Sequence, residues 1–433
     1  MGIREAIFLP VIGAICAIAL FRPRIGLYGY LWFALMRPDI VAFAEGAYPY
    51  SLALAIATAV GAIRHAGRST VWFRNPMCAL LIVLQVLIGL SVLLAVRPDL
   101  SAERYTIYIR MILVLLLIPM LITEAADCAR LLLVAAFSLG FVALKFGVYG
   151  LVKGGVDLQS GYGDMLADNN FLALALAMVI PLAWHVRALS SSVPVRVGWL
   201  AVIGSATAAV IMTGSRGGSL SMLLGLLLIV RRTRRKLAFV ALIAICLGGA
   251  IYLVQDQYFR RMETLENVHQ DASAESRFLH ATIALKMSAD HPWLGVGFGG
   301  LNYSALAPLY MEQRDGRLTN HVAHNSYLQM LVDSGIFALL LYGWLIFYAI
   351  GWLGRSAARV RLVHPQLEAI PLAIQGALIV FALGSTFYSC QRMDLPYLFL
   401  MAGAAWRGVE GRLWAAGSSD TAEFAASAES AAA

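Results

Sequence analysis

The chain has 433 residues, of which 60% are hydrophobic and only 13% are charged, and its mean hydropathy is +0.75. Because soluble domains carry roughly a quarter of their residues as charged side chains, this composition excludes an ordinary soluble domain and predicts a polytopic membrane protein. The net charge of +8 does not indicate nucleic-acid binding, since the basic residues gather in short loops between apolar segments. Five dispersed cysteines without a CxxC pair indicate neither a disulfide framework nor a zinc site.

Apolar segments of spanning or near-spanning length follow one another along most of the chain. A helix needs roughly 20 residues to cross the hydrocarbon core. Lipid cannot satisfy a loose backbone and the alternation needed for barrel strands is absent, so we expect an all-α fold. Several segments are short, and we predict about 12 transmembrane helices. The candidates are 6–21, 25–44, 51–63, 77–96, 107–122, 130–152, 168–186, 197–213, 219–230, 237–255, 326–354, 367–388 and 395–408.

A polar region at 256–325 interrupts this pattern and contains five of the eight histidines. Aqueous chemistry is expected there, because the rest of the chain is mostly lipid-soluble. The basic loops, such as RRTRRK at 231–236, should be cytoplasmic, which places the polar region outside the membrane. The predicted organisation is an N-terminal transmembrane bundle at 1–255, an external loop with amphipathic helices at 256–325, C-terminal transmembrane helices at 326–416 and a disordered cytoplasmic tail at 417–433.

Arg216 stands in the sequence TGSRGG at 213–218, between two apolar runs. An arginine at membrane depth is costly unless it has a partner or a water-filled cavity, so it is a functional candidate. The surrounding glycines let the backbone approach a ligand closely, and a guanidinium suits bidentate phosphate binding. An interfacial arginine that reaches lipid headgroups explains the same pattern equally well.

A second arginine, Arg277, lies in the segment 274–288, whose apolar residues recur at roughly helical spacing. We expect an amphipathic helix on the membrane surface, with Arg277 and His280 on one face. A solvated charge is the simpler interpretation of Arg277, and a phosphate ligand is the alternative. The glycine-rich stretch at 295–300 does not follow a strand, so it indicates a tight turn rather than a dinucleotide site.

His324 opens the sequence HNSYLQ, where the external loop re-enters the membrane. Histidine accepts a proton near neutral pH and is therefore a natural general base. The alternative is an interfacial histidine bonded to a loop carbonyl. His321 is a secondary candidate for substrate binding; because no third ligand follows at suitable spacing, we expect neither a metal ion nor a cofactor.

Polar residues at two other helix ends are further candidates for substrate binding. Asp168 precedes an apolar segment and should cap its helix, and both Asp168 and Asn170 could also line a polar cavity and bind a sugar or phosphate. Asp394 and Arg392 either form an ion pair or belong to the same cavity.

Three stretches taken together resemble the O-antigen ligase family, within the superfamily of bacterial O-antigen ligases and polymerases. They are TGSRGG at 213–218, SRFLHATIALKMSADHPWLGVGFGG at 276–300 and HNSYLQMLVDSGIF at 324–337, and Asn170 followed by FLALALAMVIPL fits the same pattern. The resemblance implies a glycosyltransferase-C-like helical bundle in the bacterial inner membrane, with its active site facing the periplasm.

The resemblance also implies a reaction, the transfer of a glycan from undecaprenyl pyrophosphate to a sugar hydroxyl of lipid A–core. Arg216 and Arg277 match arginines that hold the pyrophosphate, and His324 matches the catalytic histidine of the family. Two arginines could neutralise the leaving pyrophosphate without a metal ion, and one direct displacement would invert the anomeric centre.

Other functions share parts of this pattern. An O-antigen polymerase uses the same donor with another lipid-linked glycan as acceptor, and a protein O-oligosaccharyltransferase uses a serine or threonine. A transporter or flippase of lipid-linked glycans is a different class. It is disfavoured because the chain shows no repeat symmetry and has a long external loop.

Overall fold

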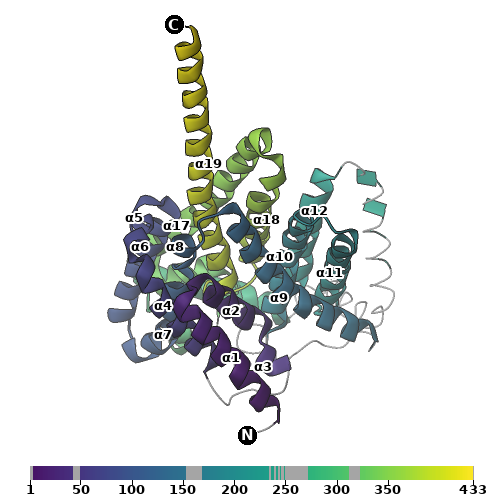
Figure 1. The fold of residues 1–433 in the computed structure, drawn as a ribbon. Coiled ribbons are helices and arrows are strands. Elements are labelled where there is room, and N and C mark those ends of the chain that lie inside the picture. Colours follow the sequence, from purple (N-terminus) through teal and green to yellow (C-terminus); the bar gives the residue numbers. More distant parts are fainter. Residues whose placement is uncertain are drawn as a thin grey trace.

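A computed structural model describes residues 3–41, 49–152, 168–233, scattered positions between 236 and 248, 272–311 and 322–432 (Figure 1). These residues are almost entirely helical, and none of them lies in a strand. The predicted all-α fold is therefore confirmed for the described part of the chain.

The helices and short 3-10 turns have the following bounds in chain order. They are α1 Ile3–Phe21, α2 Pro23–Met36, α3 Pro38–Val41, α4 Tyr50–Ala62, η1 Ile63–Arg68, α5 Val71–Arg74, α6 Pro76–Leu93, α7 Pro98–Leu115, α8 Ile118–Leu121, α9 Ala125–Val152, α10 Asn169–Arg187, α11 Val193–Met212, α12 Arg216–Arg232, α15 Ala272–Asp290, α16 Leu301–Leu306, η2 Ala307–Tyr310, α17 Ser326–Val363, η3 Pro365–Leu367, α18 Ala369–Gly384 and α19 Asp394–Ala432.

Seven helices within the described ranges are long and apolar enough to cross a membrane. They are Pro76–Leu93, Pro98–Leu121, Ala125–Gly150, Asn169–Arg187, Val193–Met212, Ser326–Val363 and Pro365–Gly384. The expected number of about 12 spanning helices is not confirmed. The helices α2, α4 and α12 have 14, 13 and 17 residues, which is short for a span, and most of the predicted segment 237–255 lies outside the described residues.

Three predicted boundaries differ from the structure for local reasons. The segment 25–44 is interrupted at Arg37, whose φ is 46°, because the following Pro38 disfavours a right-handed helical residue before it. Residues 98–106, expected in a loop, are helical, since Pro98 occupies the first position of α7, where proline is favoured. The tail from 417, expected to be disordered, continues α19 to Ala432 and is rich in alanine, the residue with the highest helix propensity.

Helix α10 is the centre of the bundle that carries the site (Figure 1). It packs against α9, α11, α12 and α18, and an unbroken run of its residues, 172–183, is buried. Small residues let the neighbouring helices approach closely, as is typical of membrane bundles. A Cβ atom added at Gly376 of α18 would lie 2.7 Å from Cβ of Pro181 in α10.

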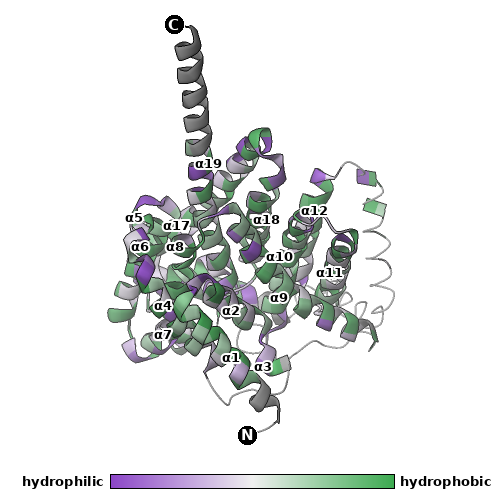
Figure 2. Cartoon of the chain, in the orientation of Figure 1, coloured by the Kyte–Doolittle hydropathy of each residue, from purple (hydrophilic) through white to green (hydrophobic). Residues whose placement is uncertain are grey.

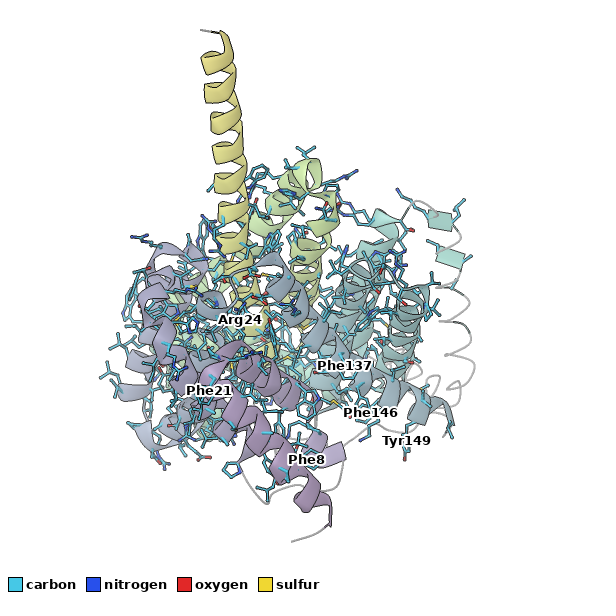
Figure 3. All side chains as sticks on the ribbon, viewed as in Figure 1. Phe8, Phe21, Arg24, Phe137, Phe146 and Tyr149 are labelled. Atoms are coloured by element: carbon cyan, nitrogen blue, oxygen red, sulfur yellow. The ribbon has the colours of Figure 1, made fainter. Side chains whose placement is uncertain are left out.

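The outer surface of the bundle is largely apolar. Figure 2 shows hydrophobic residues along the sides of the helices. Aromatic side chains of α1 and α9 point outward from the bundle, and Phe21, Phe137 and Tyr149 are 70%, 59% and 49% exposed (Figure 3). Apolar side chains in this position are expected on a surface that faces lipid.

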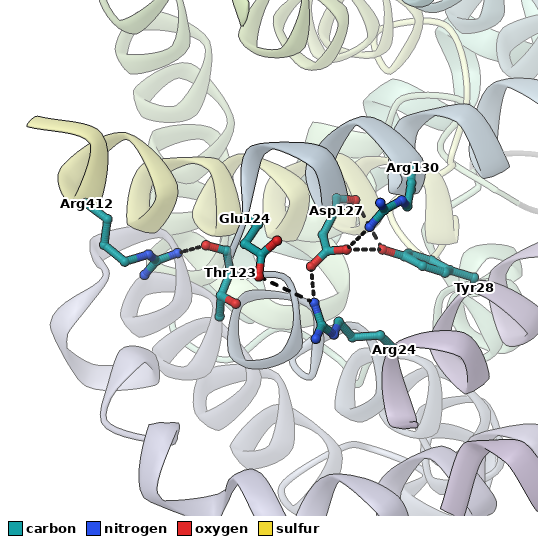
Figure 4. Close-up of polar contacts among 7 residues, drawn as sticks. All are labelled: Arg24, Tyr28, Thr123, Glu124, Asp127, Arg130 and Arg412. Atoms are coloured by element: carbon teal, nitrogen blue, oxygen red, sulfur yellow. Dashed lines mark hydrogen bonds and ion pairs between the residues drawn. The ribbon is translucent and has the colours of Figure 1, made fainter. Parts of the chain in front are cut away.

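At one end of the bundle, arginine side chains join several helices through hydrogen bonds and ion pairs (Figure 4). The buried carboxylate of Asp127, at the start of α9, pairs with Arg24 of α2 and lies 2.7 Å from the guanidinium of Arg130. Arg412 of α19 donates to the carbonyl of Thr123, so α2, α9 and α19 meet here. The C-terminal ends of α10 and α12, which carry Arg187 and Arg232, face the same side of the bundle, because α11 runs back between these two helices.

Helix α17 is broken at Gly335, whose φ of 80° and ψ of 180° are not helical. The glycine-rich stretch 295–300 lies against the break: the backbone N–H of Val296 donates to the carbonyl of Val332 at 2.8 Å, and that of Gly297 donates to the carbonyl of Asp333 at 3.0 Å. A Cβ atom at Gly335 would lie 2.0 Å from the carbonyl oxygen of Trp293. The glycine-rich stretch is therefore a turn, as predicted from the sequence, and it packs against α17.

The break in α17 predicts that alanine substitutions at two glycines of this helix differ strongly in their effect on stability. Gly335→Ala should lower the free energy of unfolding, by about 1–3 kcal/mol from the backbone conformation alone, because that conformation is essentially restricted to glycine. Gly343→Ala is the matched control, since an added Cβ there meets nothing within 4 Å and alanine favours the helix. Thermal unfolding of both variants in detergent measures this. Equal midpoints would contradict the account of the break.

Candidate functional site

The motif TGSRGG forms a tight turn between α11 and α12. Gly214 has a φ of 63°, and the Ser215 side chain caps α12 by accepting from the backbone N–H of Gly218 at 3.3 Å. Arg216 is the first residue of α12 and is exposed. A Cβ atom at Gly217 would lie 2.6 Å from the hydroxyl of Tyr388, so this turn requires glycine for close packing. The turn thus presents Arg216 at the end of the bundle opposite the Asp127 cluster.

Ser215 joins this turn to two other parts of the site. Its hydroxyl donates to Oδ1 of Asn170 at 2.9 Å and lies 2.5 Å from the hydroxyl of Tyr388. Because the Ser215 proton is directed to Asn170, Tyr388 donates in the second bond. Asn170 is therefore next to the Arg216 turn.

Asp168 caps α10 as predicted. Its Oδ1 accepts from the backbone N–H groups of Asn170 and Phe171 at 2.8 and 3.2 Å. Its carboxylate is also within electrostatic range of His324, because its charge raises the pKa of that imidazole. Asp168 thus both caps α10 and raises the pKa of His324.

His324 is held in an uncommon backbone conformation directly before α17. Its φ is 50°, in the left-handed region. The neighbours on both sides are fixed: the backbone N–H of Ala323 donates to Oε1 of Gln329 at 2.9 Å, and Asn325 caps α17 by accepting from Tyr327 and Leu328. The Asn325 amide also donates to the carbonyl of Thr386 at 3.1 Å. The imidazole therefore has a defined place at the edge of the site.

Burial and charge together keep His324 neutral. Partial burial is the largest cause of its lowered pKa, the guanidinium of Arg277 lowers it further, and Asp168 opposes both. The imidazole is consequently available as a proton acceptor at neutral pH and somewhat below the usual pKa of histidine. The structure thus brings together Arg277, His324 and Asp168.

Helix α15 supplies Arg277 and, one turn later, His280. The Nε atom of Arg277 is buried and has no hydrogen-bond partner among the described residues. Arg277 also lowers the pKa of Tyr388, although burial is the larger effect and raises that pKa to about 12. Through Tyr388, which contacts Ser215, the arginine of α15 belongs to the same site as the Arg216 turn.

His280 belongs to the site, although we predicted no role for it from the sequence. Its ring centroid lies 6.1 Å from that of His324. The hydroxyl of Tyr303 donates to the His280 carbonyl at 2.9 Å and lies 3.2 Å from Nδ1, so Nδ1 is the donor in the second contact. The one available signal was the spacing of three residues from Arg277.

Asp333 is a second residue for which we predicted no role from the sequence. It is fully buried at the break of α17. Its Oδ1 accepts from Gln329 at 2.8 Å, and its Oδ2 accepts from the backbone of Gly299 at 3.1 Å and from Gln391 at 3.3 Å. Because Gln329 also accepts from Ala323, this network extends to the backbone beside His324. A carboxylate inside an apolar segment was a usable sequence signal.

The other residues predicted from the sequence either lie apart from Arg277 and His324 or fall outside the described residues. His321 is not among the described residues. Between the described side chains of Arg392 and Asp394 there is no ion pair: Asp394 is near Tyr30 of α2, whereas Arg392 is near Asp333 and Arg104. Nor do three His, Cys, Asp or Glu side chains converge in a way that could hold a metal ion within the part of the chain that the structure describes.

The electrostatic effect of Asp168 on His324 predicts the pH dependence of a variant that changes only the charge. Asp168→Asn keeps a good helix cap but removes the charge that raises the pKa of His324, so that pKa should fall. Any activity that needs the neutral imidazole should then persist to lower pH than in the wild type. The acid limb of the pH–rate profile measures this, and a shift toward higher pH would contradict it.

These contacts define a helical membrane protein with a cationic, histidine-containing site at one set of helix ends. Comparison with family models identifies the class. Residues 199–343, which include Arg216, Arg277 and His324, match the family described as O-Antigen ligase. The resemblance of the sequence to the O-antigen ligase family is therefore confirmed over residues 199–343. Residues 3–191 match a family of unknown function (DUF5935), and no curated protein matches the chain.

Proposed function

We propose that this protein is an O-antigen ligase that transfers a glycan from undecaprenyl pyrophosphate to a sugar hydroxyl of lipid A–core, by an inverting mechanism that needs no metal ion. The observation that carries the proposal is that a neutral, partly buried His324 lies within electrostatic range of Arg277, whose buried Nε has no hydrogen-bond partner among the described residues. A proton acceptor beside a cation is what glycosyl transfer from a phosphate leaving group requires.

Arg216 and Arg277 bind the donor pyrophosphate in this proposal. Arg216 is exposed at the first position of α12, where the helix dipole adds to its positive charge. Arg277 approaches from α15, and Tyr388 lies between the Ser215 turn and Arg277. Guanidinium groups from two different helices can hold two phosphate groups at a defined distance.

The reaction is one displacement at the anomeric carbon. His324 takes the proton of the acceptor hydroxyl, and the acceptor oxygen forms a bond to the anomeric carbon. The bond from that carbon to the phosphate oxygen breaks on the opposite side, and its electron pair leaves with the pyrophosphate. The arginines stabilise the negative charge that develops on the leaving group.

The distribution of basic residues supports a periplasmic position for the site. Arg187, Arg232 and Arg130 lie at helix ends opposite those that carry Asp168 and Arg216. If the basic end faces the cytoplasm, the site faces the periplasm of a bacterial inner membrane. A lipid-linked, already activated donor suits that compartment.

The experiment that tests the proposed function compares acceptors with one donor. Purified protein in detergent and EDTA receives undecaprenyl-pyrophosphate-linked glycan together with lipid A–core, a second lipid-linked glycan or a Ser/Thr peptide. We expect product with lipid A–core. Product only with the lipid-linked glycan or the peptide would assign a polymerase or a protein glycosyltransferase instead. No covalent product would favour a transporter, and loss of activity in EDTA would contradict the metal-free mechanism.

A further inference from the structure

Two arginines outside the proposed donor site flank the buried carboxylate of Asp333. Arg104 of α7 packs on the glycine-rich turn, since a Cβ atom at Gly299 would lie 2.6 Å from Cβ of Arg104. The backbone N–H of that same Gly299 donates to Asp333. On the other side, Gln391 donates to the same carboxylate oxygen, and the next residue is Arg392.

Asp333 is not a hydrogen-bond partner of either arginine. Its two oxygens accept from Gln329, Gly299 and Gln391. Arg104 has a buried Nε without a hydrogen-bond partner, and Arg392 makes no hydrogen bond or ion pair, in each case with respect to the described residues. One buried carboxylate also cannot neutralise two guanidinium groups.

The two positive charges affect each other. The pKa of Arg392 is lowered first by burial and then by the charge of Arg104, while Asp333 raises it. Holding like charges together in a partly buried place costs free energy, and an anion between them would reverse that cost.

The position of Arg104 is fixed by a separate set of contacts. Asn302 of α16 accepts from the backbone N–H of Arg97 at 2.9 Å and donates to Ser101 at 2.8 Å. These bonds hold the first turns of α7 against the glycine-rich turn. The arginine pair is therefore built into the fold from several elements rather than being a chance meeting of surface side chains.

The arginine pair and the donor site are connected through His324. Gln329 bonds both Asp333 and the backbone N–H of Ala323, the residue before His324. The segment 385–393 supplies Tyr388 to the Arg216 turn and Arg392 to the arginine pair. His324 thus has contacts that lead to two separate groups of arginines.

We propose that Arg104 and Arg392 bind an anionic group, a phosphate or a carboxylate, of the acceptor glycan. The proposal rests on the proposed function. An inverting displacement needs the acceptor on the side of the anomeric carbon opposite the leaving pyrophosphate. A cationic pair distinct from Arg216 and Arg277 therefore suits the acceptor rather than the donor. Its effect is to hold the acceptor hydroxyl near His324.

The test uses Arg104→Gln and Arg392→Gln in the full-length protein. With phosphorylated lipid A–core as the varied substrate, we expect the acceptor KM to rise about tenfold or more in each variant, while the donor KM stays unchanged. Wild-type protein with enzymatically dephosphorylated acceptor should show the same rise, and the variants should be insensitive to that treatment. Arg97→Gln is the matched control, an exposed arginine at the start of the same helix region, and should behave as wild type.

Opposite results overturn the proposal. An unchanged acceptor KM in both variants, or a rise in the donor KM, would contradict it. An effect in the variants that persists equally with dephosphorylated acceptor would exclude phosphate as the bound group, and a carboxylate-reduced acceptor then decides whether any anion is bound.

Direct binding of phosphorylated lipid A–core without donor separates this proposal from the proposed function. Binding that depends on Arg104 and Arg392 supports the pair even if no transfer occurs. Arg392→Lys, which keeps the charge, should bind with intermediate affinity.

Discussion

His324→Asn is expected to lower the rate of glycan transfer by about 10²–10⁴-fold, the usual contribution of a general base. Asparagine tolerates the left-handed conformation that His324 adopts, so the backbone before α17 should be retained. What the variant loses is a side chain that accepts a proton. Single-turnover transfer with saturating donor measures this rate, and donor binding and thermal stability should stay close to those of the wild type.

The same substitution at another histidine provides the control. His291 lies just after the end of α15, in the same region of the chain, but has no part in the described contacts of His324. His291→Asn should transfer glycan at the wild-type rate. If both variants lose activity equally, or if His324→Asn keeps most of its rate, the role assigned to His324 is wrong.

Arg216→Lys is expected to lower kcat/KM for the donor by about 10- to 10²-fold, although the charge is kept. The lost free energy corresponds to about 1.5–3 kcal/mol for a hydrogen bond to a charged group. An ammonium group cannot reproduce the two parallel hydrogen bonds that a guanidinium makes to phosphate. Steady-state rates at varied donor concentration measure the change.

The far end of the same helix supplies a matched control. Arg231 is exposed in the last turn of α12, at the opposite end from Arg216. Arg231→Lys should leave kcat/KM unchanged, because only the charge near the helix end matters there. Wild-type turnover in Arg216→Lys would contradict a bidentate contact with the donor.

The residues that the sequence predicted best are polar side chains on an apolar background. Arg216, Arg277 and His324 stand out because charge and imidazole are costly near lipid and need a reason to be there. The structure brings Arg277 and His324 within electrostatic range of each other and places Asn170 beside the Arg216 turn. The helical fold was also predictable, since lipid requires internally hydrogen-bonded backbone and the sequence lacks the alternation of barrel strands.

The residues that the sequence did not predict depend on contacts between distant parts of the chain. Tyr388 contacts Ser215 from 173 positions away, and the Gly299–Asp333 bond depends on the break in α17. Neither contact has a local pattern. Asp333 is different, because a carboxylate inside an apolar helix was visible, and only its partners required the structure.

Local helix rules account for the boundaries at which the structure differs from the prediction. The pattern of apolar residues identified α7 from 107 onward but could not include the polar turns that Pro98 begins. At the other end of the chain, small polar residues suggested disorder, whereas the many alanines favour the helix that continues α19.

The most direct test of the central claim is the stoichiometry and stereochemistry of one reaction. Purified protein in detergent and EDTA is given radiolabelled undecaprenyl-pyrophosphate-linked glycan and lipid A–core. We expect one undecaprenyl pyrophosphate to be released for each glycan transferred, with the anomeric configuration inverted in the product. His324→Asn should slow both release and transfer by about 10²–10⁴-fold. Release without transfer, a retained configuration, or full activity of His324→Asn would contradict it.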